Sequence, residues 1–133
     1  MATKTIHTSG KRKSAIARAT LKAGTGKVRV NHKLIDTIEP RMVRMKIQEP
    51  IILAEEVMND IDLSVNVMGG GMTSQADAVR LAMSRALAQH NKKLEQVFLT
   101  YDRHMLVADV RRKESSKPGR HGQARAKRQK SYR

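Results

Sequence analysis

Apolar and polar residues alternate in two segments of the chain, and this period of two predicts β-strands. In residues 14–22, every second position carries an apolar side chain on one face, and in residues 61–67 the alternation is stricter still. The intervening Ala-Gly-Thr-Gly segment at 23–26 predicts a hairpin turn, because glycine tolerates the positive φ that such turns need. Residues 27–31 are therefore expected to pair with the first strand.

Three other segments show the spacing of amphipathic helices. Residues 34–58 have apolar positions at helical intervals, interrupted at Pro40 and Pro50. We expect Pro50 in the first turn of a new helical segment, where its missing N–H leaves no hydrogen bond unmade. A short helix is expected over residues 94–101.

A run of three glycines at residues 69–71 ends the strand at 61–67 and precedes the longest predicted helix. That helix extends to about Gln89, and Ser74 and Asp77 have a spacing like that of a capping box. The glycine run has two interpretations. It is either a cradle of backbone N–H groups for a phosphate at a helix N-terminus, or a tight turn that needs unusual φ angles.

Positive charge is concentrated at the two ends of the chain. Residues 1–29 carry eight Lys and Arg side chains and no acid, a net charge of +8. Residues 111–133 carry ten against one acid, a net charge of +9. The whole chain has a net charge of +15, so residues 30–110 sum to −2. A near-neutral middle between cationic ends favours binding to a nucleic acid.

The hydrophobic pattern and the charge together predict one domain with two basic extensions. Residues 1–13 form a basic N-terminal arm or the start of an edge strand, and residues 14–110 form a globular α+β domain. A short last strand is expected over residues 105–110. Periodicity ends after Val110, so residues 111–133 are expected to be an extended basic tail that cannot fold alone.

The remaining composition excludes several classes of protein. The chain has no cysteine, which removes disulfides and thiolate chemistry, and its five histidines share no metal-ligand spacing. No apolar run approaches the roughly 20 residues of a membrane span, and the N-terminus lacks the apolar segment of a signal peptide. We therefore expect a cytoplasmic, non-enzymatic protein without cofactors, bound metal, membrane contact or a small-molecule substrate. Only three residues are aromatic, which favours phosphate contacts over base stacking.

Several motifs resemble the universal S-nine family of small-subunit ribosomal proteins, in its archaeal and eukaryotic form. They are Gly-Lys-Arg-Lys-Ser-Ala-Ile-Ala-Arg-Ala at 10–19, Val-Asn at 30–31, the glycine run with the residues that follow it at 69–80, Ser-Arg-Ala-Leu at 84–87, Asp-Val-Arg-Arg at 109–112 and Gln-Lys-Ser-Tyr-Arg at 129–133. The resemblance implies a single compact domain with helices packed on one face of a mixed four-stranded sheet. It also implies a left-handed βαβ crossover, whereas spacing alone would favour the usual right-handed connection.

The resemblance further implies partners: 16S-like rRNA of the subunit head, neighbouring head proteins and tRNA in the peptidyl site. Together with the charge pattern, it predicts rRNA contacts from Lys11, Arg12, Lys13, Arg18, Lys27, Arg29, Gly69, Gly70, Gly71, Arg80, Arg111, Arg112, Lys113, Lys117, Arg120, Arg125, Lys127 and Arg128. It also predicts that the end of the tail approaches tRNA through Lys130, Tyr132 and Arg133. The alternative is a free architectural protein of the nucleoid type, which would bind DNA.

Overall fold

The computed structural model describes residues 4–119 and residue 124. Its sheet is open and mixed and has five strands in the order β1-β2-β5-β3-β4. Most strands are antiparallel to their neighbours, but β3 and β5 are parallel and are connected through helices. The strands are β1 (Ile6–Arg12), β2 (Ala15–Ala23), β3 (Val28–Val30), β4 (Lys33–Leu34) and β5 (Ile61–Met68).

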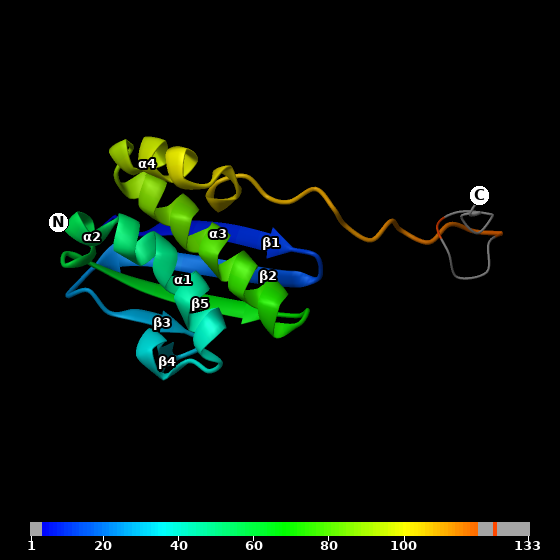
Figure 1. The fold of residues 1–133 in the computed structure, drawn as a ribbon, viewed down its shortest axis with the longest axis horizontal. Coiled ribbons are helices and arrows are strands. Elements are labelled where there is room, and N and C mark those ends of the chain that lie inside the picture. The colour runs from blue at the N-terminus through cyan, green and yellow to red at the C-terminus, as the bar shows by residue number, and fades with distance from the viewer. Residues whose placement is uncertain (1–3, 120–123, 125–133) are drawn as a thin grey trace.

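The helices cover one face of the sheet and leave the other face open (Figure 1). Apolar side chains at alternate strand positions, such as Ala17, Leu21 and Val65, are buried beneath them, as the period of two predicted. The α+β class and the single domain are confirmed. The helices are α1 (Arg41–Leu53), α2 (Glu55–Met58), α3 (Met72–His90) and α4 (Lys93–Tyr101), with two short 3-10 helices, η1 (Ile35–Thr37) and η2 (Arg103–Met105).

The predicted hairpin between β2 and β3 is wrong, because β5 lies between these two strands. The glycine-containing loop crosses the start of β5 instead of turning back along β2. Gly24 N–H donates to the Asp60 carbonyl and Gly26 N–H to the Ile61 carbonyl, each at 3.0 Å. This arrangement puts β5, the most regularly apolar strand, in the centre of the sheet, where it is covered best. The handedness of the connection from β3 to β5 stays a prediction.

Residues 6–12 belong to the sheet rather than to a free arm, which is the second of the two possibilities that the sequence left open. Strand β1 pairs with β2 along its whole length and forms one edge of the sheet. Gly10 lets this edge strand approach α3 closely. A Cβ atom at Gly10 would overlap the Ala78 carbonyl oxygen and lie 2.7 Å from the Ala82 nitrogen, so no larger residue fits without a shift of the backbone.

Two helix boundaries differ from the prediction. Helix α1 begins after Pro40 and continues through Pro50, so Pro50 does not start a new segment. Its ring is buried in the last turn of the helix. Helix α3 begins at Met72 with Gly71 as its N-cap and no side-chain cap, so Ser74 lies inside the first turn. The predicted capping box is therefore wrong.

The expected strand at residues 105–110 is absent. The chain forms η2 there and then continues without helix or strand through residue 117, before a turn at residues 118–119. Helix α4 covers nearly the predicted range. The predicted four strands therefore become five, because β1 and β4 join the sheet and the C-terminal segment does not. Within the described part of the chain, no helix is long and apolar enough to cross a membrane.

Candidate nucleic-acid interface

The open face of the sheet carries four exposed cations from β2, β3 and the loop before β3. Arg18 on β2, Lys22 on β2, Lys27 before β3 and Arg29 on β3 are all exposed. None of the four forms an ion pair within the described residues. The sheet register brings them onto one surface, because Arg18 lies beside Asn66 of β5 and Arg29 lies beside Ser64. The exposed positions of these strands therefore form one basic face of the sheet.

Asp62 lies opposite Lys22 in the sheet register, and its carboxylate accepts hydrogen bonds from the backbone. One oxygen accepts hydrogen bonds from the N–H groups of Thr25, Gly26 and Lys27, at 2.9, 3.1 and 2.9 Å. The hydrogen bond from the Lys27 N–H, together with that from Thr25, lowers the pKa of Asp62. Asp62 therefore fixes the loop that carries Lys27. Nothing in the sequence pattern had singled it out.

A second group of predicted residues meets at the turn between β1 and β2. Lys11, Lys13 and Ser14 line a hollow together with Arg111, Arg112 and Lys113. Folding thus joins segments that are about a hundred residues apart in the chain. Lys117 lies further along the exposed segment and forms an ion pair with Glu114 at 3.0 Å.

Arg80 is predicted as an rRNA contact, but its side chain is turned into the domain. Only 12% of it is exposed, and its guanidinium forms ion pairs with Glu49 and Asp102 at 2.6 and 3.1 Å. Burial raises the pKa of Asp102, but hydrogen bonds from the His104 N–H and from Arg80 outweigh it, so the pKa is lowered overall. We therefore assign Arg80 to the packing of α1, α3 and the end of α4.

Arg12 is placed in a similar way. Its side chain is 19% exposed and forms ion pairs with Asp109 at 2.7 Å and, more loosely, with Asp77 at 3.7 Å. Asp77 also accepts a hydrogen bond from Lys46 at 2.8 Å. These contacts hold β1, α1, α3 and the segment after η2 together. We therefore assign Arg12 a structural role within the fold.

The glycine run is a tight turn at two of its three positions. Gly69 and Gly70 have φ angles of +79° and +65°, which favour glycine. A Cβ atom at Gly69 would also lie 2.6 Å from the Ser14 carbonyl oxygen. Gly71 has an extended backbone and open space around it. The turn explains Gly69 and Gly70, while a phosphate contact at the start of α3 stays a prediction.

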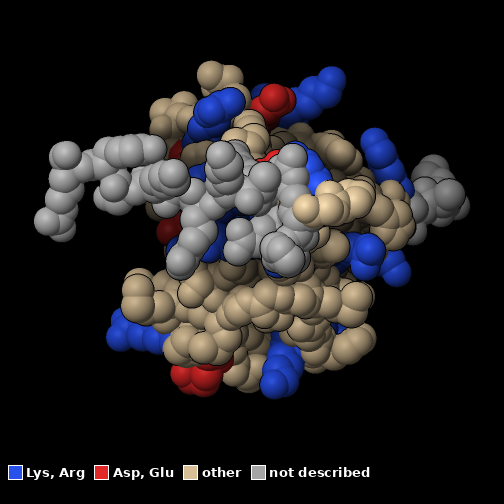
Figure 2. Space-filling model, turned by 90° about the vertical axis from the view of Figure 1, so that its right-hand side faces the viewer, with Lys and Arg blue, Asp and Glu red and all other residues tan. Residues whose placement is uncertain are grey.

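Seven predicted contact residues lie outside the described part of the chain. They are Arg120, Arg125, Lys127, Arg128, Lys130, Tyr132 and Arg133. Figure 2 views the end of the domain from which residues 106–119 leave, and Lys and Arg side chains surround that end on several sides.

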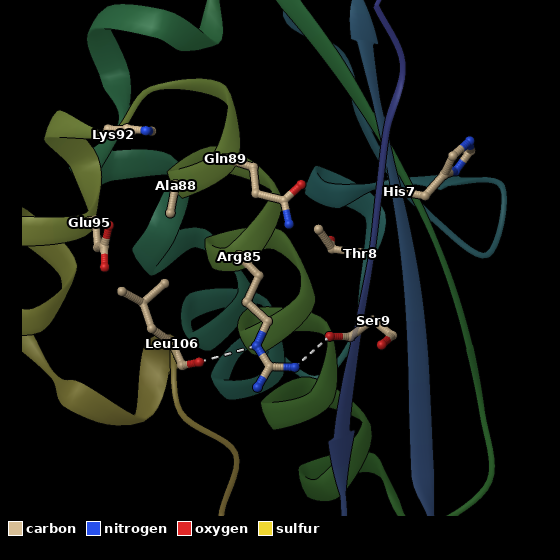
Figure 3. A pocket seen from close by; sticks show the side chains of 9 residues that line it. All are labelled: His7, Thr8, Ser9, Arg85, Ala88, Gln89, Lys92, Glu95 and Leu106. Atoms are coloured by element: carbon tan, nitrogen blue, oxygen red, sulfur yellow. Dashed lines mark hydrogen bonds between the residues drawn. The ribbon is translucent and has the colours of Figure 1, made fainter.

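A further hollow, with a volume of about 770 Å³, lies between the edge strand β1 and helices α3 and α4 (Figure 3). Arg85 spans it, donating from Nε to the Leu106 carbonyl at 3.1 Å and from NH1 to the Ser9 carbonyl at 2.9 Å. His7 lies on β1 and points away from Arg85 in this view. The described residues contain no group of three or more His, Asp or Glu that could hold a metal ion.

The sequence is similar to those of known ribosomal proteins along nearly its whole length. Residues 10–133 match the family described as ribosomal protein S9/S16. The chain belongs to this family. It is 50% identical over 133 residues to the small ribosomal subunit protein uS9 of Methanococcus maripaludis strain C5, covering 98% of this chain and 99% of that protein. The uS9 proteins of Methanococcus vannielii and Methanothrix thermoacetophila are 49% and 48% identical, with the same coverage.

These findings confirm the resemblance to the archaeal and eukaryotic form of the family that was inferred from the motifs, and the relatives named above are archaeal. The family is one of ribosomal proteins and not of enzymes. Three residues that position the predicted contacts were not predicted from the sequence: Asp62, Arg85 and Asp109. Their signal was weak, because a single acid or a single arginine in a charged segment has no distinctive spacing.

Proposed function

We propose that this protein is a structural constituent of the small ribosomal subunit in the cytoplasm, where it binds rRNA of the head without catalysing a reaction. The observation that carries the proposal is the open sheet face, where Arg18, Lys22, Lys27 and Arg29 are exposed and form no ion pair within the described residues. Its family membership supports the ribosomal assignment.

The chemistry of this face favours an RNA backbone. Lys and Arg side chains on a rigid sheet can each bind a phosphate, and each contact releases counterions from the RNA. The strands of this face carry no aromatic residue for base stacking, so we expect shape and phosphate spacing to decide where the protein binds. The sheet is held from behind by the helices, so the cations are positioned before the RNA arrives.

The tail extends the proposal beyond the described residues. We propose that residues 111–133 run through rRNA as an extended segment and that Lys130, Tyr132 and Arg133 approach tRNA in the peptidyl site. The net charge of +9 over these residues supports a phosphate-rich surrounding. Both the tRNA contact and the left-handed connection from β3 to β5 rest on the family resemblance.

Co-sedimentation tests the ribosomal role against that of a DNA-binding protein of the nucleoid type. Lysate from the source cells is separated on a sucrose gradient after a high-salt wash, and the protein is followed by immunoblot with and without DNase. We expect it to travel with the small subunit in both cases. Migration with DNA, and its loss from that fraction after DNase treatment, would instead support the nucleoid role.

The end of the tail is tested separately in subunits that carry a chain shortened by Lys130 to Arg133. We expect normal occupancy of the subunit, because most of the anchoring charge remains. Dissociation of peptidyl-site tRNA should become faster, by an amount equivalent to about 1–3 kcal/mol for a charge-assisted hydrogen bond. Unchanged tRNA dissociation at full occupancy would leave the protein with a scaffolding role alone.

A further inference from the structure

A hollow with a volume of about 780 Å³ lies where the tail leaves the domain. One wall is the turn between β1 and β2, with Lys11, Lys13 and Ser14, and the other is residues 111–113. Lys13 has a φ of +54°, in the left-handed region, so the backbone reverses direction tightly there. Two segments from opposite ends of the chain thus form one site.

The charge of this hollow is unbalanced. Five of its six lining residues are Lys or Arg, and none is an acid. Arg111 is paired with Asp109, but the other four cations repel one another, and an anion between them would relieve that repulsion. The remaining lining residue, Ser14, is exposed and contributes a hydroxyl donor that also suits an oxyanion.

Asp109 holds the second wall in place. Its carboxylate lies 2.7 Å from NH1 of Arg12 and accepts hydrogen bonds from the Arg111 N–H at 2.9 Å and from NH2 of Arg111 at 2.8 Å. The Asp109 side chain is only 16% exposed. Hydrogen bonds from Arg111, with the charge of Arg12 beside them, hold the pKa of Asp109 far below its usual range, so it stays ionised.

Arg85 adds a second attachment three residues earlier in the same segment. It donates to the carbonyl of Leu106 and to that of Ser9 on β1, as Figure 3 shows. The segment therefore follows β1, with Leu106 joined to Ser9 and Asp109 joined to Arg12. It is fixed at two points before the tail begins, which makes the hollow preformed.

We propose that this hollow binds one stretch of RNA sugar–phosphate backbone and that Asp109 is the positioning residue that builds it. The inference rests on the proposed rRNA binding and adds a defined site to it. The residues that line the hollow include no aromatic ring for stacking and no carboxylate to accept from a base amino group, so it reads phosphate and not sequence. Arg112 brings a planar fork that can hold two phosphate oxygens.

RNA fits the site better than an acidic protein segment because the hollow continues a basic surface. Lys11 is paired with Ile16 on β2, two residues from Arg18 on the open sheet face. The hollow therefore connects that face with the basic tail. A regularly spaced polyanion can follow such a track, whereas the carboxylates of a peptide have no fixed spacing of this kind.

The first experiment measures how binding to a transcript of the rRNA head domain depends on KCl. The hollow variant of the full chain carries Lys13→Gln, Arg112→Gln and Lys113→Gln. A control with the same net charge carries Lys33→Gln, Lys92→Gln and Lys93→Gln, which are exposed residues away from the hollow. The slope of log K against log salt should fall by about 2–3 units in the hollow variant, at about 0.7–0.9 per lost phosphate contact, and by less than about 0.5 in the control.

The second experiment uses a substitution for which the positioning role and the net charge predict opposite changes in RNA affinity. Asp109→Asn makes the protein more positive, so general electrostatics predicts tighter RNA binding. Loss of the carboxylate that joins Arg12 to Arg111 predicts weaker binding, by about 3- to 10-fold, because the wall of the hollow is no longer held. Asp36→Asn makes the same charge change at an exposed site and should bind as tightly as the wild type or tighter. Asp109→Glu should recover part of the loss.

A spectroscopic measurement supports this test. Because the chain has no cysteine, spin labels react only with cysteines that are introduced. We place two of them, Ser64→Cys on β5 and Val110→Cys beside Asp109. Asp109→Asn should broaden the distance distribution between them, measured at a temperature where the variant is folded.

The outcomes separate the two proposals. If the wild type binds the head transcript no better than another transcript of equal length, the proposed function fails. If the wild type binds preferentially but the hollow variant behaves like its control, the hollow is not a phosphate site. Binding of the hollow to polyglutamate but not to RNA would assign it to an acidic protein. Binding by Asp109→Asn that is as tight as that of Asp36→Asn, or an unchanged distance distribution, would overturn the positioning role.

Discussion

The two sides of the sheet use positive charge in different ways. On the helix side, Arg12, Lys46 and Arg80 each form ion pairs with carboxylates, and the charge is consumed in joining elements of the fold. On the open side, Arg18, Lys27 and Arg29 have no such partner within the described residues. Both groups consist of Lys and Arg side chains, but their roles differ. On these two faces, a partly buried ion pair, and not the cation itself, distinguishes a structural charge from one that is available to a ligand.

The largest effect is expected on the open side. Replacing Arg18, Lys22, Lys27 and Arg29 together with Gln should weaken binding to the rRNA head domain by about 1000-fold, at about 1 kcal/mol for each phosphate contact. The free energy of unfolding should change by less than about 0.5 kcal/mol, because none of the ion pairs of the described residues is lost. Filter binding and urea unfolding measure the two quantities. A large loss of stability with intact binding would reverse the roles assigned to the two sides.

On the helix side, Gly10→Ala should destabilise the protein without touching any charge. The added Cβ overlaps backbone atoms of α3, with the Ala82 nitrogen at 2.7 Å, so β1 or α3 must move. We expect a loss of about 3 kcal/mol in the free energy of unfolding, as for an overpacked core. Gly71→Ala is the matched control, since a Cβ there meets no atom within 4 Å. Equal urea midpoints for the two variants would contradict the close packing of β1 on α3.

A smaller loss of stability is expected for Arg80→Gln. The change leaves Glu49 and Asp102 facing each other in a partly buried place without their shared cation. Breaking a fully buried pair costs about 3–5 kcal/mol, and the partial exposure of both acids reduces the expected loss to about 2 kcal/mol. Binding to rRNA, measured at a temperature where the variant is folded, should stay within about 2-fold of the wild type. A selective loss of RNA binding would return Arg80 to the interface.

The smallest effect concerns acid stability and Asp62. Because its pKa in the folded state is below the usual value of 3.8, its ionised form stabilises the fold above that pH. This contribution is lost as the pH falls through the lowered pKa. Asp62→Asn should therefore flatten the decline in stability below about pH 4. The control is Asp60→Asn, which changes a neighbouring side chain that accepts no hydrogen bond in the described part of the chain. Urea unfolding across this pH range would contradict the role of Asp62 if both variants declined as steeply as the wild type.

The sequence by itself determined the class of the fold and much of its surface. Alternation in residues 14–22 and 61–67 placed two strands to within one residue and assigned their buried faces, because a period of two sorts side chains by face whatever the neighbouring strand is. Arg18 and Arg29 occupy the exposed positions of this alternation. The motifs at residues 10–19 and in the glycine run were enough to identify the family, because they are local and do not depend on strand order.

Only the tertiary structure decided which strands are neighbours and which charges are free. The loop at residues 24–27 has the composition of a hairpin turn, yet Asp62 and the start of β5 bind its N–H groups and carry β3 to the other side of β5. Likewise, nothing local separates Arg80 from Arg18, or brings Asp109 to Arg12. Such pairings depend on contacts between segments far apart in the chain. Periodicity reports the face of a single element, whereas strand order and ion pairing depend on how the elements pack.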